Sequence, residues 1–282
     1  MIAILGGLGA AVMWATATLC TSRSSRMIPP VSVLAWVMIV GSVASLPFAA
    51  ASGVPSQLNA GLWRWLVVIG VSNVGGLLLV YSGLRIGKVG IVAAITSAEG
   101  AVAATIAVLT GERLGVGAAM TLVLIALGVI LASFSREADA TRRRHNGVAI
   151  LLSCGAALLF GVGLYAAGRV STELPLSWIL LPPRVVGVVA VALPLLLVGK
   201  LRFSREAAPY VIAAGIAEII GLGSYTIGAR HGIAISAVLG SQFAALSAIV
   251  AFFVFRERLA RVQLLGVTAI IVGVAALTVL RS

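Results

Sequence analysis

The sequence has few charged residues, and this scarcity excludes most soluble proteins. Asp, Glu, Lys and Arg together make up 10% of the 282 residues, whereas a soluble domain carries about 25%. So few charges cannot coat the surface of a folded soluble chain of this length. A soluble enzyme, a disordered chain and a small disulfide scaffold are therefore excluded. The 61% hydrophobic content and the mean hydropathy of +1.15 indicate a helical integral membrane protein.

Residues that carry catalysis or bind metals are also scarce. The chain has two histidines, two cysteines and a single aspartate, Asp139. It contains no HExxH zinc motif, no pair of aspartates and no GxxxxGK[ST] phosphate loop. Cys20 and Cys154 lie far apart without a CxxC motif, so a disulfide has no support in the sequence. We therefore expect no enzymatic activity, no cofactor and no metal.

The net charge of +12 raises the question of nucleic-acid binding. Nucleic-acid-binding proteins gather Lys and Arg on one folded surface. Here the basic residues stand singly or in small groups between long apolar runs. This spacing is typical of the positive-inside bias of membrane proteins, so we expect no nucleic-acid partner.

Ten apolar segments are long enough to span a bilayer, which takes about 20 residues. The longest polar connection, 136–146, has 11 residues and is too short for a folded domain. The sequence thus predicts an all-α membrane protein with a first five-helix unit at 1–135, a polar basic linker at 136–146 and a second unit at 147–282. The expected helices are 2–20, 31–51, 63–84, 88–110, 114–134, 147–168, 176–198, 208–229, 232–255 and 261–280.

The two units repeat one another at a shift of about 145 residues. Several glycines coincide, and the tripeptide Glu112-Arg113-Leu114 meets Glu257-Arg258-Leu259 in a chain with seven glutamates. Because five helices are an odd number, the second unit must cross the membrane in the opposite sense to the first. We therefore expect ten transmembrane helices in two inverted five-helix repeats.

The distribution of Lys and Arg agrees with inversion. Odd-numbered connections hold 14 of the 20 basic residues, and even-numbered connections with the C-terminus hold five. The bias also reverses between corresponding connections of the two units. We expect the protein in a cell membrane. By the positive-inside rule, both of its termini should lie on the side away from the cytoplasm.

The two units contain three short motifs: Gly9-Ala10-Ala11-Val12-Met13-Trp14, Gly111-Glu112-Arg113-Leu114 and Arg256-Glu257-Arg258-Leu259. With these motifs and the ten expected helices, the sequence resembles the EamA-type exporters of the drug/metabolite transporter superfamily. This resemblance implies export of small metabolites, often amino acids and sometimes drugs, through a cavity between the halves. Because one chain holds both halves, we expect a functional monomer.

The sequence departs from the family pattern at several places. Members often have an Arg early in the second helix, which is missing here, and often have proline at the positions of Glu99 and Ala244. Their termini more often lie in the cytoplasm, opposite to the orientation that the charge bias predicts.

Three charged residues fall well inside predicted helices, away from their ends: Glu99, Arg184 and Glu218. An unpaired charge at the bilayer centre costs at least about 2.5–3.5 kcal/mol on insertion scales. One interpretation is a fixed ion pair between Arg184 and either glutamate. The other is that the three line the cavity, where acids meet the ammonium group of an amino acid and Arg184 meets its carboxylate. We also expect the adjacent Pro182 and Pro183 to kink or unwind the seventh helix.

Polar and aromatic residues at matched positions extend the candidate site. Asn73, Thr96 and Gln242 belong to polar positions that match between the repeats. Tyr225 shares a helical face with Glu218, and Thr18 shares one with Trp14. Interhelical hydrogen bonding or packing is the alternative for each. The further predicted substrate-binding residues are Trp14, Thr18, Asn73, Thr96, Tyr225 and Gln242.

These features favour a secondary transporter that exports a small metabolite, foremost an amino acid, by alternating access. Export of organic cations or drugs is the alternative within transport, because two acids and several aromatics suit a cation. A lipid-handling or purely structural membrane protein is a third hypothesis, which predicts no aqueous cavity. The expected partners are the small-molecule substrate and the lipid bilayer.

Overall fold

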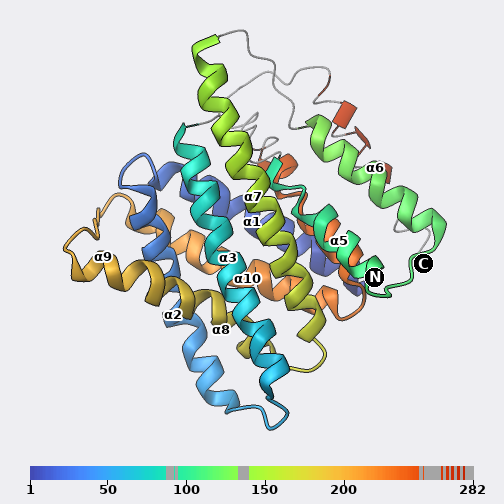
Figure 1. Ribbon diagram of the computed structural model, residues 1–282, viewed down its shortest axis with the longest axis horizontal. Helices are drawn as coiled ribbons and strands as arrows, with labels where there is room; N and C mark the ends of the chain where they lie inside the picture. The colour runs from blue at the N-terminus through green and yellow to red at the C-terminus, as the bar shows by residue number, and fades with distance from the viewer. Residues whose placement is uncertain are drawn as a thin grey trace.

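Every element of the protein that the structure describes is a helix. The computed structural model describes residues 1–86, 95–132 and 140–247, with single residues or pairs at 92, 250 and between 262 and 276. Within these residues there is no β-strand. The expectation of an all-α protein is therefore confirmed (Figure 1).

In the described part of the first half there are five helices, several with local start and stop signals. Pro30 begins the second of them, where its missing N–H is not needed, and Gly53 ends that helix at a φ of 65°. Gly111, at a φ of 109°, follows the fourth. The helices are α1 (Ile2–Ser24), α2 (Pro30–Ser52), α3 (Ala60–Ile86), α5 (Glu99–Leu109) and α6 (Val116–Ala132).

The second half begins with a long helix that includes part of the predicted linker. Residues 140–146 continue α7, so this helix starts seven residues before the span that apolarity predicts. The described elements are α7 (Ala140–Val170), α8 (Leu176–Gly187), the π-helical segment η1 (Val188–Ala192), α9 (Leu193–Leu197), α10 (Ala208–Ala229) and α11 (Ile233–Gly240).

Among the described residues, six helices are long and apolar enough to cross a membrane: Ile2–Ser24, Pro30–Ser52, Ala60–Gly83, Gly147–Val170, Leu176–Leu197 and Ala208–Ala229. Three shorter apolar helices, Glu99–Leu109, Val116–Gly128 and Ile233–Ser247, lie within the predicted fourth, fifth and ninth segments. Of the predicted tenth segment, 261–280, the structure describes only single residues and pairs. The chain is thus a multi-pass membrane protein.

The seventh predicted helix keeps its path past two adjacent prolines. Pro182 and Pro183 lie inside α8, and the helix passes through η1 before continuing as α9. A π-helical turn is a usual response to a disturbed hydrogen-bond ladder. The prolines therefore accompany a local change of helical pitch rather than an end of the span.

Helices from the two halves of the chain pack against each other. α1 lies along α10 and α11, α3 lies along α7, and α2 packs on α8 (Figure 1). α5 contacts both α7 and α11, whereas α6 lies at the margin of the bundle. Small residues permit this close approach: a Cβ atom on Gly6 would lie 2.6 Å from the Cα of Gly228.

Candidate functional site

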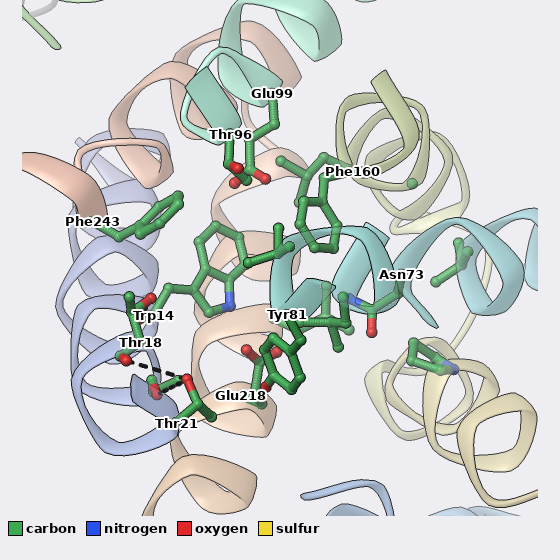
Figure 2. A pocket seen from close by; sticks show the side chains of 18 residues that line it. Trp14, Thr18, Thr21, Asn73, Tyr81, Thr96, Glu99, Phe160, Glu218 and Phe243 are labelled. Carbon is green, nitrogen blue, oxygen red and sulfur yellow. Dashed lines mark hydrogen bonds between the residues drawn. The ribbon is translucent and has the colours of Figure 1, made fainter. Parts of the chain in front are cut away.

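A cavity lies among α1, α3, α5, α7 and α10. Its volume of about 90 Å³ exceeds what one water needs, about 10–15 Å³ by the same measure, so several waters or a small organic group fit. Figure 2 shows its principal side chains. The wall is mostly apolar and is made by Trp14, Ala17, Thr18, Thr21, Ile69, Asn73, Leu77, Val80, Tyr81, Thr96, Glu99, Phe160, Gly163, Leu164, Pro183, Glu218, Leu222 and Phe243.

Two helices are interrupted beside the cavity at matched places in the repeat. Residues 97 and 98 form a turn immediately before α5, and residues 241 and 242 form a turn after α11. At these turns, Ala98 N donates to the Ile95 carbonyl and Gln242 N to the Leu239 carbonyl. Interrupted helices in corresponding halves are a typical mark of a transporter's binding site.

Glu99 and Glu218 both reach the cavity wall from different helices. Glu99 begins α5 and is only 5% exposed, and the Glu218 side chain on α10 is 13% exposed. In Figure 2 the two carboxylates lie on opposite sides of the Trp14 indole ring. The cavity therefore presents two acids to whatever occupies it, and the contact of these two residues with a substrate stays a prediction.

Arg184 lies behind the cavity wall rather than in it. Its side chain is fully buried, and its Nη2 lies 3.9 Å from Oε2 of Glu218. Its Nη1 contacts the sulfur of Met38 at 3.7 Å, and a Cβ atom on Gly41 would lie 2.6 Å from its Cδ. Among the described residues, Nε and Nη2 have no hydrogen-bond partner. The arrangement matches the ion-pair interpretation of Arg184 more closely than direct contact with a substrate.

Four further predicted residues line the cavity: Trp14, Thr18, Asn73 and Thr96. The Thr18 hydroxyl donates to the Trp14 carbonyl at 2.8 Å and is thus engaged within α1. Oδ1 of Asn73 and Oγ1 of Thr96 are buried without a hydrogen-bond partner among the described residues. Both oxygens can accept a hydrogen bond from a bound molecule, and burying them unpaired is unfavourable.

Tyr225 and Gln242 lie outside the cavity wall. The fully buried Tyr225 hydroxyl donates to the Leu164 carbonyl at 2.7 Å, and its ring lies 6.2 Å from that of Trp14. Nε2 of Gln242 donates to the Val238 carbonyl at 2.9 Å. The Tyr225 bond joins α10 to α7, which is the interhelical bonding that the sequence left open. The Gln242 bond stays within its own segment, and its Oε1 has no hydrogen-bond partner among the described residues.

Sequence reasoning missed several members of the wall, including Thr21, Tyr81, Phe160 and Phe243. Phe160 could have been predicted, because it aligns with Trp14 when the second repeat is laid over the first. Both rings also meet a glycine in the same way: a Cβ atom on Gly76 would lie 2.5 Å from the Phe160 ring, and one on Gly221 would lie 2.6 Å from the Trp14 ring. Nothing in the sequence distinguished Thr21, Tyr81 and Phe243 from their neighbours in the chain.

The first of the two matching loop motifs joins helices of opposite halves. The Glu112 carboxylate follows α5 and accepts hydrogen bonds from the backbone N–H groups of Ile233 and Ala234 at the start of α11. Glu112 therefore caps the start of α11. Glu257, its repeat counterpart, lies outside the described residues.

Comparison with known proteins identifies the family of the first half. Residues 1–134 match the sequence model of the EamA-like transporter family. This part of the chain belongs to that family. The match places the protein in the drug/metabolite transporter superfamily, as the sequence motifs predicted. No curated protein matches the chain.

A solved crystal structure shares the fold of the EamA-like chain. The two superpose with a TM-score of 0.78 at 20% sequence identity, over 99% of this chain and 96% of the other. An identity this low shows the fold alone. Members of the family are transporters rather than enzymes, which agrees with the absence of catalytic motifs in the sequence.

Proposed function

We propose that the protein is a secondary transporter that exports small amine-bearing metabolites across the cell inner membrane by alternating access. The observation that carries this proposal is a cavity with two acidic residues beside two interrupted helices. The family supports transport, and the cavity supplies a place for a small molecule. A purely structural protein gives no reason to bury two acids in a cavity wall.

The proposal includes ten transmembrane helices in two inverted repeats, residues 1–135 and 147–282, acting as a monomer with both termini outside the cytoplasm. The helix contacts support it, because the repeat relation converts the α1–α10 pair into the α7–α3 pair. One contact between a glycine and a long side chain also repeats: Gly41 lies against Arg184, and Gly187 lies against Met38. The repeat relates Met38 to Arg184 and Gly41 to Gly187, each at a shift of 146 residues.

The charges in the wall decide which part of a substrate the site holds. An ammonium group can meet the carboxylate of Glu99 or of Glu218, and the rings of Trp14, Phe160 and Phe243 suit a cation or an apolar tail. An amino acid also carries a carboxylate, but Arg184 does not line the cavity. This observation favours amines and organic cations over amino acids, which were the leading expectation.

The test compares each amino acid with the amine left when its carboxylate is removed. Phenylalanine and phenethylamine form one pair, and tryptophan and tryptamine another. A ligand at 100 times its Kd stabilises the folded protein by about 2.7 kcal/mol. We expect the amines to raise the melting temperature of the purified protein more than the amino acids do.

Two variants make the panel specific. Glu99→Gln and Glu218→Gln keep the size of the side chain and remove a negative charge, so each is expected to weaken the effect of amines. Glu173→Gln is the matched control, because Glu173 is exposed and pairs with Arg169 away from the cavity. Stronger stabilisation by the amino acids would favour the zwitterion, and no response to either class would contradict the proposal.

A further inference from the structure

One face of the bundle is closed by direct backbone contact between the halves. We call it the Glu112 face; it contains the start of α1, the end of α5, the end of α10 and the start of α11. A Cβ atom on Gly6 would lie 2.6 Å from both the Gly228 Cα and the Ser224 carbonyl, and one on Gly7 would lie 2.8 Å from the Ser236 carbonyl. These distances leave no space between α1 and its two neighbours.

The cavity lies deeper in the bundle, beyond this closed crossing. On α1 its wall begins at Trp14 and continues to Thr21, toward the opposite face. From Gly6 to Trp14 the helix rises about 12 Å, at 1.5 Å per residue. The closed layer on the Glu112 face is therefore about two helical turns thick, and a substrate cannot pass it unless the halves separate there.

Glu112 joins the two halves across this layer. Its Oε2 accepts from Ile233 N at 3.1 Å and from Ala234 N at 3.2 Å, and its Oε1 lies 3.3 Å from Ala234 N. The first N–H groups of a helix have no partner within the helix, and a carboxylate there is favoured by the helix dipole. The bonds link the end of α5 in the first half to the start of α11 in the second.

We propose that Glu112 is a gate latch: its bonds to the start of α11 hold the Glu112 face closed and must break before the cavity opens on that side. The latch needs no contact with substrate, because it acts on the relative position of α5 and α11. A separate bond, from Arg230 Nε to the Ser171 carbonyl at 2.7 Å, ties the end of α10 to the end of α7 within the second half. The inference rests on the alternating access proposed above.

The experiment measures the distance across this face directly. Arg113 and His231 are both exposed and lie next to the two ends of the latch. Each is replaced by cysteine for spin labelling, in a background where Cys20 and Cys154 are replaced by alanine. Double electron–electron resonance then reports the share of molecules with a long distance between the labels in lipid nanodiscs.

Glu112→Ala is expected to raise the ratio of open to closed molecules about tenfold, which corresponds to about 1.4 kcal/mol, the scale of one hydrogen bond to a charged group. Glu112→Gln keeps one acceptor and should give a smaller rise. Glu173→Gln is the matched control, because this exposed glutamate forms an ion pair only within its own segment. It should leave the distances as they are in the parent protein.

A second pair of variants tests the same gate without touching the latch. Gly6→Ala should force α1 from α10 and also favour the open form, whereas Gly9→Ala should not, because its Cβ would meet Ser224 atoms at an ordinary 3.4 Å. Unchanged distances in folded Glu112→Ala would overturn the latch, whatever the amine panel shows. If the distances change but no amine binds, the latch stands and the proposed substrate class fails.

Discussion

The buried pair of Arg184 and Glu218 allows a quantitative test of what each charge does. Arg184 is fully buried, and Glu218 is the acid that lies within 4 Å of it among the described residues. Removing one partner of such a pair leaves the other charge buried and uncompensated, which destabilises a protein by about 3–5 kcal/mol. We expect Arg184→Met and Glu218→Gln each to lower the free energy of unfolding by this amount.

The double variant Arg184→Met/Glu218→Gln distinguishes the pair from two independent effects. With both charges gone, no buried ion remains uncompensated, and replacing both partners of a buried pair is often neutral or stabilising. We therefore expect the double variant to be more stable than either single variant. The double variant should still be less stable than the parent protein, because methionine fills the space against Gly41 less completely than arginine does.

The assay is reversible unfolding in mixed detergent micelles, combined with phenethylamine binding on the same samples. The stability and binding readouts separate the two roles of Glu218. The double variant should regain stability but not amine binding, because Glu218 also lines the cavity. Single variants that each lose less than about 1 kcal/mol would refute the pairing. A double variant that binds amines like the parent would remove Glu218 from the binding site.

Two further predictions concern packing and orientation. Tyr225→Phe should lower the free energy of unfolding by about 1–3 kcal/mol, because the Leu164 carbonyl loses the hydroxyl that donates to it. Stabilisation by amines should persist in this variant. Loss of that stabilisation would show that Tyr225 takes part in binding. A green fluorescent protein fused after Ser282 should stay dark in cells if the C-terminus lies outside the cytoplasm, so bright fluorescence would reverse the predicted orientation while leaving the helical fold intact.

Much of the helical layout followed from apolarity alone, because a span has a minimum length that a short soluble helix does not share. The starts and ends of α2 and α10 differ from their expected positions by at most one residue. The start of α7 differs more, because residues 140–146 are polar enough to leave the bilayer yet remain helical. Hydropathy measures where a helix is buried in lipid rather than where its hydrogen bonds begin.

The candidate site was predictable where the repeat fixed a depth, and less so where side-chain direction mattered. Glu99, Glu218, Asn73 and Thr96 were placed at the middle of their helices, and all four line the cavity. Arg184 has a similar depth, but its side chain turns toward Met38 and Gly41. Depth can be counted along a sequence, whereas the direction of a side chain depends on neighbours from distant segments.

The packing of α1 also bears on how the chain is made. α1 ends at Ser24, and its principal partner α10 begins at Ala208, about 180 residues later. At a synthesis rate of about 5–20 residues per second, the first helix spends roughly 10–40 s in the membrane before that partner emerges from the ribosome. During this interval the glycine face that later meets α10 is open to lipid or to another helix. The newborn protein thus has a period in which its first span is vulnerable to wrong pairing, and insertion factors that shield it would act then.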